Sequence, residues 1–254
     1  MEKKYKMTEE TINVNGITLY RIEALKDFAN IKKGDKGGFV EKKENLSQSG
    51  NCWVYHTAKV YGNAEVYNDA KVGGNVDVFG NAIVYDNAKV FGNARVYDTA
   101  KVYGKAVIYG NAKVGGNVEV FGNAIVYDNA KVFEDTKVGG NVEVCGNAKV
   151  YGNAMIYDNA KVFEDTEVCG NVEVCGNAEI RGDAEIASNS DYIVFKNWWS
   201  SGRYFTWTKS NNMWKVGCFY GTGKELIEKA YKDSNESGKE YEKIVKYVES
   251  ILKV

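Results

Sequence analysis

The sequence predicts an all-β solenoid of the parallel β-helix type, and three observations lead to this prediction. A six-residue period runs from Gly50 to Ala187 without insertion or deletion. The chain has 27 glycines, 13% aromatic residues and no proline, a composition that suits repeated strands and turns better than long helices. Hydrophobic residues make up 44% of the 254 residues and charged residues 26%, which excludes a disordered, collagen-like or membrane-spanning chain.

Each hexad has the pattern of a short strand that ends in a tight turn. The fifth position is Val or Ile in all 23 hexads, and the third position is always small. Residues two apart in a strand point to the same side, so Ala82 and Val84 are predicted to face inward while Ile83 and Tyr85 face outward. Gly and Asn at the first two positions tolerate the positive φ that a sharp bend requires. Stacked coils then bury Val over Val and Ala over Ala.

Residues 1–49 are predicted to form an N-terminal β cap. Two strand-like segments, 11–14 and 17–20, are joined by Asn15-Gly16, which is the strongest hairpin signal in the chain. A cap is needed because the first coil would otherwise expose an unpaired apolar end. Residues 50–187 form the repeat itself.

Residues 188–254 are predicted to form a small C-terminal α+β domain that covers the other end. A three-stranded meander over 192–196, 203–208 and 213–219 precedes two helices. Thr222 with Glu225, and Ser237 with Glu240, have the spacing of capping boxes. The last helix is predicted to carry one apolar face, formed by Tyr241, Ile244, Val245, Val248, Ile251 and Leu252.

The repeat resembles the hexapeptide repeat of left-handed β-helix proteins, in which three hexads form one triangular coil. This resemblance implies a left-handed helix of about eight 18-residue coils. The whole chain also resembles a family of phage- and prophage-encoded hexapeptide-repeat proteins. The segments that carry this likeness are LYRIEAL at 19–25, GGFVE at 37–41, ENLS at 44–47, GNCWVY at 50–55 and GCF at 217–219. It implies a bacteriophage accessory protein without an established activity.

An acyltransferase is one activity that the repeat brings into consideration. Enzymes that resemble this repeat use a histidine base in a groove between coils, helped by a protruding loop and by trimer contacts. The single histidine, His56, occupies a turn position, and the 23 hexads contain no inserted loop. We therefore interpret His56 as a solvated turn residue and expect a protein that is not an enzyme and has no cofactor.

The cysteines and the N-terminus indicate a reducing compartment. Five cysteines without a CxxC pair argue against a disulfide scaffold and a zinc site. Cys145, Cys169 and Cys175 fall on three sides of a triangular coil, so we expect no joint metal site. The N-terminus lacks the apolar core of a signal peptide, and no run approaches eighteen apolar residues. These features predict a cytoplasmic protein that has no membrane partner, and the family resemblance implies that the cell is a bacterial host.

Two sets of outward residues are candidate binding surfaces on the rod. Lys plus Arg (33) and Asp plus Glu (34) nearly cancel, so charge recognition must be local. With 18-residue coils one column contains Arg95, Lys113, Lys131 and Lys149, which is either an anion-binding stripe or a solvated lysine face. The sixth position is aromatic in fifteen hexads, which predicts stacks of Tyr67, Tyr85, Tyr103 and Phe121 and of Tyr61, Phe79 and Tyr97. These columns are either structural ladders or a surface for a partner.

The C-terminal domain supplies the third candidate surface. Its candidate partner-binding residues are Trp198, Trp199, Trp207, Trp214 and Tyr220. Strand alternation places Phe205 and Trp207 on the face expected to pack on the helices, whereas Trp198 and Trp199 lie in a turn and are typical of interface anchors.

Together these features predict a non-enzymatic phage accessory protein that binds a bacterial host protein or ribonucleoprotein. By analogy with the family it resembles, the expected role is that of an inhibitor of a bacterial defence system such as CRISPR. The alternatives are a structural rod that forms homo-oligomers, a nucleic-acid binder that uses the Lys/Arg stripe and, last, a hexapeptide acyltransferase.

Overall fold

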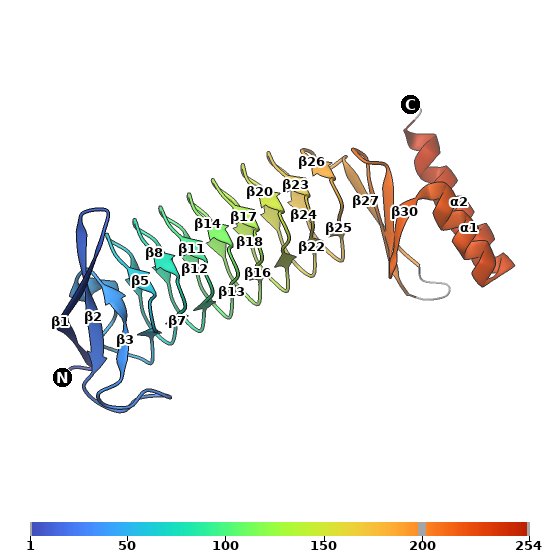
Figure 1. Ribbon diagram of the computed structural model, residues 1–254. Helices are drawn as coiled ribbons and strands as arrows, with labels where there is room; N and C mark the ends of the chain where they lie inside the picture. Colours follow the sequence, from blue (N-terminus) through green and yellow to red (C-terminus); the bar gives the residue numbers. More distant parts are fainter. Residues whose placement is uncertain (1, 198–201, 253–254) are drawn as a thin grey trace.

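The computed structural model describes residues 2–197 and 202–252, which form a long rod with a cap at each end (Figure 1). The rod is a β-solenoid of about eight coils, and each complete coil adds one two-residue strand to each of three sheets. Strands 18 residues apart pair in parallel, as Arg95 does with Lys113 and Val96 with Val114. The prediction of a parallel β-helix with 18-residue coils is confirmed.

We name the three sides of the rod after their sheets. The A face contains β5 (Lys59–Val60), β8 (Asp77–Val78), β11 (Arg95–Val96), β14 (Lys113–Val114), β17 (Lys131–Val132), β20 (Lys149–Val150), β23 (Glu167–Val168) and β26 (Glu185–Ile186). The B face contains β4 (Trp53–Val54), β7 (Lys71–Val72), β10 (Lys89–Val90), β13 (Val107–Ile108), β16 (Ile125–Val126), β19 (Glu143–Val144), β22 (Lys161–Val162) and β25 (Glu179–Ile180). The C face contains β6 (Glu65–Val66), β9 (Ile83–Val84), β12 (Lys101–Val102), β15 (Glu119–Val120), β18 (Lys137–Val138), β21 (Met155–Ile156) and β24 (Glu173–Val174).

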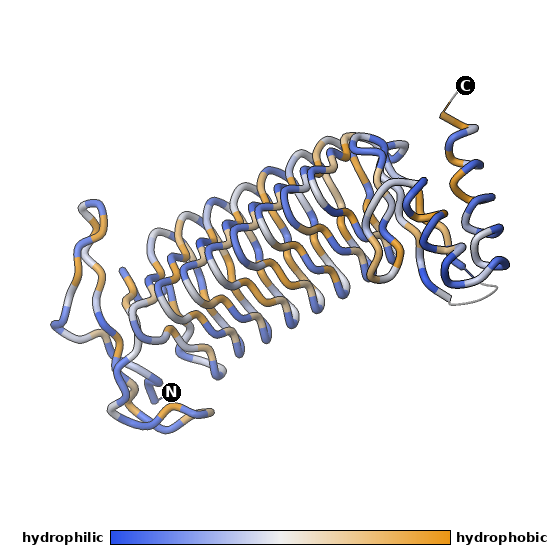
Figure 2. Tube along the Cα trace, turned by 45° about the vertical axis from the view of Figure 1, so that its right-hand side comes forward, coloured by the Kyte–Doolittle hydropathy of each residue, from blue (hydrophilic) through white to orange (hydrophobic). Residues whose placement is uncertain are grey.

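The inward positions form one continuous core along the axis. The third and fifth residues of every hexad are buried, as predicted, and Val78, Val96 and Val114 are successive partners in the A-face ladder. Thr136, at a third position, is also buried, and its Oγ1 donates to the carbonyl oxygen of Phe133 at 2.6 Å. Hydrophobic and hydrophilic segments alternate in the same way from coil to coil (Figure 2). Because apolar burial is the main favourable term in folding, this stack of buried side chains holds the coils together.

The turns depend on residues that adopt a positive φ at the first hexad position. Glycine fills many of these positions, whereas Asp98 stands at one of them with φ 58°. Its Oδ2 accepts a hydrogen bond from the backbone N–H of Gly116, one coil further on, at 3.0 Å. Six acidic residues at this position make the same bond to the glycine 18 residues later: Asp86, Asp98, Asp128, Glu134, Asp158 and Glu164. These carboxylates therefore bind adjacent coils together at the corners.

The N-terminal cap adds strands to the A face. A hairpin of β1 (Tyr5–Val14) and β2 (Ile17–Ala24) turns at Asn15 and Gly16, which have φ values of 50° and 87°. The predicted hairpin is thus confirmed. β2 pairs antiparallel with β3 (Lys36–Val40), and β3 pairs in parallel with β5, which joins the cap to the first coil. A 3₁₀ helix, Lys43–Asn45, follows.

A buried lysine closes the N-terminal end of the core. Lys4 is 1% exposed, and its Nζ donates to the carbonyl oxygen of Cys52 at 2.9 Å and to those of Ser49 and Gly50, each at 3.3 Å. The Sγ of Cys52 lies 3.1 Å from the same nitrogen. Burial lowers the pKa of Lys4 and raises the pKa of the Cys52 thiol. The ammonium group satisfies carbonyls that have no preceding coil to bond them.

The C-terminal cap is a four-stranded antiparallel sheet covered by two helices (Figure 1). Its elements are β27 (Tyr192–Lys196), β28 (Tyr204–Thr208), β29 (Met213–Val216), β30 (Phe219–Thr222), α1 (Gly223–Asp233) and α2 (Asn235–Ile251).

Two sequence predictions about this cap were wrong in detail. The third predicted strand, 213–219, ends at Val216 because Gly217, with φ 54°, turns the chain into a fourth strand. The predicted capping box of Ser237 does not begin α2, because Ser234 is the N-cap and its side chain accepts from the N–H of Ser237. The capping box of Thr222 and Glu225 at α1 is confirmed.

Side chains of the C-terminal segment satisfy the free backbone donors of the last coil. The N–H groups of Glu173, Glu179 and Glu185 lie on the last strand of the C, B and A faces, respectively. They donate to Asn189 Oδ1 at 2.8 Å, to Thr206 Oγ1 at 3.0 Å and to Ser210 Oγ at 2.8 Å. All three sheet edges therefore end on side-chain acceptors, which protects them from pairing with another chain.

Candidate functional site: the basic column of the A face

Four basic side chains follow one another along the A face. Arg95 pairs with Lys113, Lys113 with Lys131 and Lys131 with Lys149, so the predicted column is continuous. We call these four residues the basic column. Neighbouring strands lie about 4.8 Å apart, which spaces the backbone of the four residues evenly along the rod. At its two ends the column meets carboxylates, Asp77 and Glu167.

Most of the column has no carboxylate neighbour. Asp77 is paired with Lys59 at 2.8 Å, and Glu167 pairs with Lys149 at 3.3 Å. Among the residues that the structure describes, no carboxylate lies within 4.0 Å of Arg95, Lys113 or Lys131. The guanidinium group of Arg95 instead lies 5.2 Å from the centre of the Phe79 ring and 5.9 Å from that of Tyr97.

Amide and aromatic side chains flank the basic column. On the turn before it stands a ladder of asparagine side chains. The Nδ2 of each of the first four donates to the Oδ1 of the next at 3.1–3.2 Å, and the last donates to Asp165 at 2.8 Å: Asn75, Asn93, Asn111, Asn129 and Asn147. Each amide uses one of its two N–H groups in this ladder. After the column, the rings of Tyr97 and Phe133 meet across Gly115, with centroids 6.5 Å apart. The A face thus combines cations, amide donors and half-buried aromatic rings, which suit an extended anionic ligand.

The aromatic columns stack as predicted. On the C face the centroids of Tyr67, Tyr85, Tyr103 and Phe121 follow one another at 5.0, 4.9 and 5.4 Å. On the A face Tyr61, Phe79 and Tyr97 stack at 5.2 and 5.3 Å. Burial, with the hydrogen bond from Tyr103 to Glu119, raises the pKa of Tyr103 to about 12. Because these rings cover one another, the contacts support the structural-ladder interpretation.

The candidate partner-binding residues of the C-terminal domain lie in different environments. Trp207 is 1% exposed and Trp214 2%, so their assignment to a partner surface is wrong: they form the core between the sheet and the helices. Strand alternation places Trp207 beside Phe205 on the helix-facing side, as predicted. Tyr220 is 37% exposed, and its hydroxyl donates to the carbonyl oxygen of Arg181 at 3.1 Å, which ties the cap to the rod. Trp198 and Trp199 lie outside the described residues.

The remaining candidates are dispersed. His56 is exposed at a turn, with φ 52°, as its interpretation as a solvated residue requires. Cys145, Cys169 and Cys175 follow strands of the B, A and C faces, in agreement with the prediction of three different sides. Within residues 2–197 and 202–252, no three His, Cys, Asp or Glu residues are grouped as metal ligands would be.

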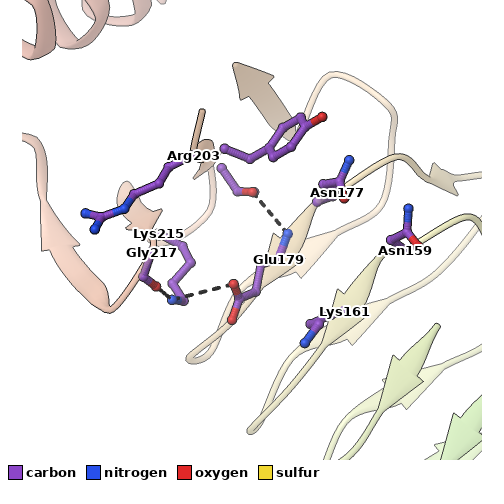
Figure 3. Close-up of a pocket in the computed structure, with 10 residues that line it drawn as sticks. Asn159, Lys161, Asn177, Glu179, Arg203, Lys215 and Gly217 are labelled. Atoms are coloured by element: carbon purple, nitrogen blue, oxygen red, sulfur yellow. Dashed lines mark hydrogen bonds and ion pairs between the residues drawn. The ribbon is translucent and has the colours of Figure 1, made fainter. Parts of the chain in front are cut away.

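A cavity at the joint between rod and C-terminal cap was not predicted from the sequence. It has a volume of about 260 Å³ and is lined by Lys161 and Glu179 of the B face and by Lys215 of the cap (Figure 3). The Nζ of Lys215 donates to the carbonyl oxygen of Gly217 and lies 3.5 Å from Glu179 Oε2. The backbone N–H of the same Glu179 donates to Thr206 (Figure 3). Since these contacts neutralise Lys215 and Glu179, we interpret the cavity as a structural joint.

No protein-family model matches the chain, and no curated protein matches its sequence. Among the solved structures that match is the acetyltransferase domain of PglB from Neisseria gonorrhoeae FA1090, at 16% identity and a TM-score of 0.41. The match covers 45% of this chain and 55% of that one. A likeness at this level assigns no activity to the chain.

Over the described part of the chain, no helix is both long enough and apolar enough to cross a membrane.

Proposed function

We propose that this chain is a non-enzymatic binding rod that holds an anionic macromolecule along its A face. In the setting that the family resemblance implies, the rod is a phage accessory protein and its target is a protein or ribonucleoprotein of a bacterial defence system such as CRISPR. The basic column carries the proposal, because Arg95, Lys113 and Lys131 are stacked without a carboxylate within 4.0 Å in the described part of the chain.

The energetics of the column favour an anionic partner. Like charges at about 4.8 Å repel one another, and an anion that lies along them removes this repulsion. The buried ladder fixes the backbone spacing of the four residues, so little ordering of the backbone is needed on binding. Both ends of the rod are occupied by caps, which leaves the sides as the extended exposed surface.

Free nucleic acid is a second candidate partner, and a specific observation favours it. The rings of Tyr97 and Phe133 and the asparagine ladder border the basic column on its two sides. Single-stranded nucleic acids bind to this combination, with phosphates on cations and bases against rings.

A pull-down with charge-reversal variants tests the proposal. The tagged protein is incubated with bacterial lysate with and without nuclease, and bound material is examined by mass spectrometry and nucleic-acid staining. The test variant is Lys113→Glu with Lys131→Glu. The matched control is Lys229→Glu with Lys232→Glu, which makes the same change in net charge on exposed positions of α1.

The outcomes separate the candidates. A stoichiometric protein or ribonucleoprotein that survives nuclease, is lost with the test variant and is kept by the control would support the proposal. Capture of nucleic acid alone, lost at high salt, would support the second candidate. Equal capture by both variants would contradict the A face as the site, and Trp198→Ala with Trp199→Ala would then test the C-terminal alternative.

A further inference from the structure

A second cationic site lies on a different side of the rod, at the N-terminal end of the B face. A cavity of about 450 Å³ is lined there by Lys71, Lys89 and Lys105, together with Asp69, Asn87 and Ala29. Ala29 belongs to the loop between β2 and β3, which projects from the side of the rod (Figure 1). The loop is anchored by Phe28, whose ring lies 5.4 Å from that of Trp53, and by a 3.2 Å hydrogen bond between Tyr55 and Asn30.

Lys105 is an exception to the pattern of the repeat. The second position of the 23 hexads holds Asn, Asp or Thr everywhere else. Further along the same corner of the rod, Asn123 donates to Asn141 at 2.9 Å and Asn141 to Asn159 at 3.0 Å. Lys105 cannot continue this ladder, because an ammonium group has no acceptor.

Asn87 stands between Asp69 and Lys105 at this corner of the rod, and neither of them extends the asparagine ladder. Asp69 Oδ1 is already bonded to the N–H of Asn51 at 3.1 Å and to its Nδ2 at 2.9 Å. In the parts of the chain that the structure describes, the side-chain amide of Asn87 makes no ladder bond to Asp69 or to Lys105. A stabilising corner contact has therefore been replaced by a cation and a free amide.

The charges around the cavity are unbalanced. Lys71 and Lys89 are partners in the B-face ladder, and Lys105 lies on the next coil. Over residues 2–197 and 202–252, none of these three lysines has a carboxylate within 4.0 Å. Asp69 is the one carboxylate among the lining residues, and the amide of Asn51 occupies it. Three cations and one engaged carboxylate make a cavity that attracts an anion.

We propose that this cavity binds a phosphate group, held by the ammonium groups of Lys71, Lys89 and Lys105 and by the amide of Asn87. Ammonium groups bind phosphate as compact point charges, and hydrogen bonds from them to an oxyanion are stronger than neutral ones. Ala29 of the loop between β2 and β3 lines the cavity beside the lysines, and we infer that a compact phosphate fits there better than a long polymer. The site is separate from the basic column, since it lies on another sheet.

Equilibrium dialysis with radiolabelled inorganic pyrophosphate tests this site. The full chain is measured at an ionic strength of about 0.1 M, where charges beyond about 10 Å are screened. The test variant is Lys105→Asn, which removes a cation and restores the residue type of the ladder. Lys101→Asn is the matched control, because it makes the same chemical change on the C face.

We expect the full chain to bind pyrophosphate and Lys105→Asn to weaken binding by about tenfold. Its thermal unfolding midpoint should be equal to or higher than that of the unmodified chain, because the variant can rejoin the ladder. Lys101→Asn should bind as the unmodified chain does. Failure to bind pyrophosphate, equal binding by Lys105→Asn, or equal weakening by Lys101→Asn would each overturn the proposal.

Discussion

At the scale of single residues, the acidic turn residues have two roles that can be measured separately: they adopt a positive φ and they accept a hydrogen bond from the next coil. Asp98 adopts a positive φ and also accepts a hydrogen bond from Gly116. Asp98→Gly removes the acceptor but also removes the Cβ and so relieves the backbone strain, whereas Asp98→Ala removes the acceptor and keeps a Cβ in the strained conformation. We expect Asp98→Ala to cost about 2–3 kcal/mol and Asp98→Gly about 1 kcal/mol.

Thermal unfolding of both variants beside the unmodified chain measures the difference. If Asp98→Gly were as damaging as Asp98→Ala, the hydrogen bond alone would explain the loss and backbone strain would have no part in it.

At the same scale, the inward-facing residues could be predicted from the sequence, whereas the hydrogen bonds between turns of different coils could not. The period alone assigns Ala82 and Val84 to the interior, since alternation in a strand is a local property. The bond from Asp98 to Gly116 joins residues of different coils, so it can be recognised only once the coil length is known. The signal was present, because each of the six acidic residues precedes a glycine by 18 positions.

At the scale of elements, the stacked rings of the C face are expected to stabilise the rod. Tyr85 lies between Tyr67 and Tyr103, with ring centroids 5.0 and 4.9 Å away. Each such pair contributes about 0.5–1.5 kcal/mol beyond area burial, so Tyr85→Ala should destabilise by about 2–3 kcal/mol and lower the unfolding midpoint. The control is Met155→Ala, which truncates a 36% exposed side chain outside the ladder on the same face. An unchanged midpoint for Tyr85→Ala would contradict a structural role for the column.

The elements of the C-terminal cap show where sequence patterns are ambiguous. Ser234 and Ser237 are equally suitable N-caps by residue type, and the choice depends on where α1 ends. Since α1 ends at Asp233, Ser234 closes the first helix and begins the second. Gly217 could similarly stand within a strand or a turn, and its role follows from the pairing of Val216 with Phe219.

At the scale of the whole molecule, the rod is predictable from the sequence because its contacts repeat, whereas its surfaces are not. The basic column follows from the 18-residue register, as the pairs from Arg95 to Lys149 show. The cavity near Lys105 needs the loop between β2 and β3, and no local pattern places that loop against the B face. Burial of Trp214 likewise depends on how the two helices pack on the sheet.

The final prediction concerns the C-terminal cap and its effect on the association of whole molecules. Removal of residues 188–254 would expose the last coil, where Tyr192 and Val194 now pack against the core and three N–H groups bond to cap side chains. Open strand edges and apolar ends pair with other chains. We therefore expect the 1–187 chain to associate end to end in sedimentation velocity while the full chain does not.

A triple variant, Asn189→Ala, Thr206→Val and Ser210→Ala, separates the two contributions of the C-terminal cap. It keeps the apolar cover but removes all three acceptors, and each unpaired N–H costs about 1–3 kcal/mol. We expect this variant to unfold at a lower temperature without associating, because the cap still covers the strand edges. If the 1–187 chain sedimented as a single species with the stability of the full chain, the C-terminal segment would not be acting as a cap, and its sheet and helices would be free to serve a partner.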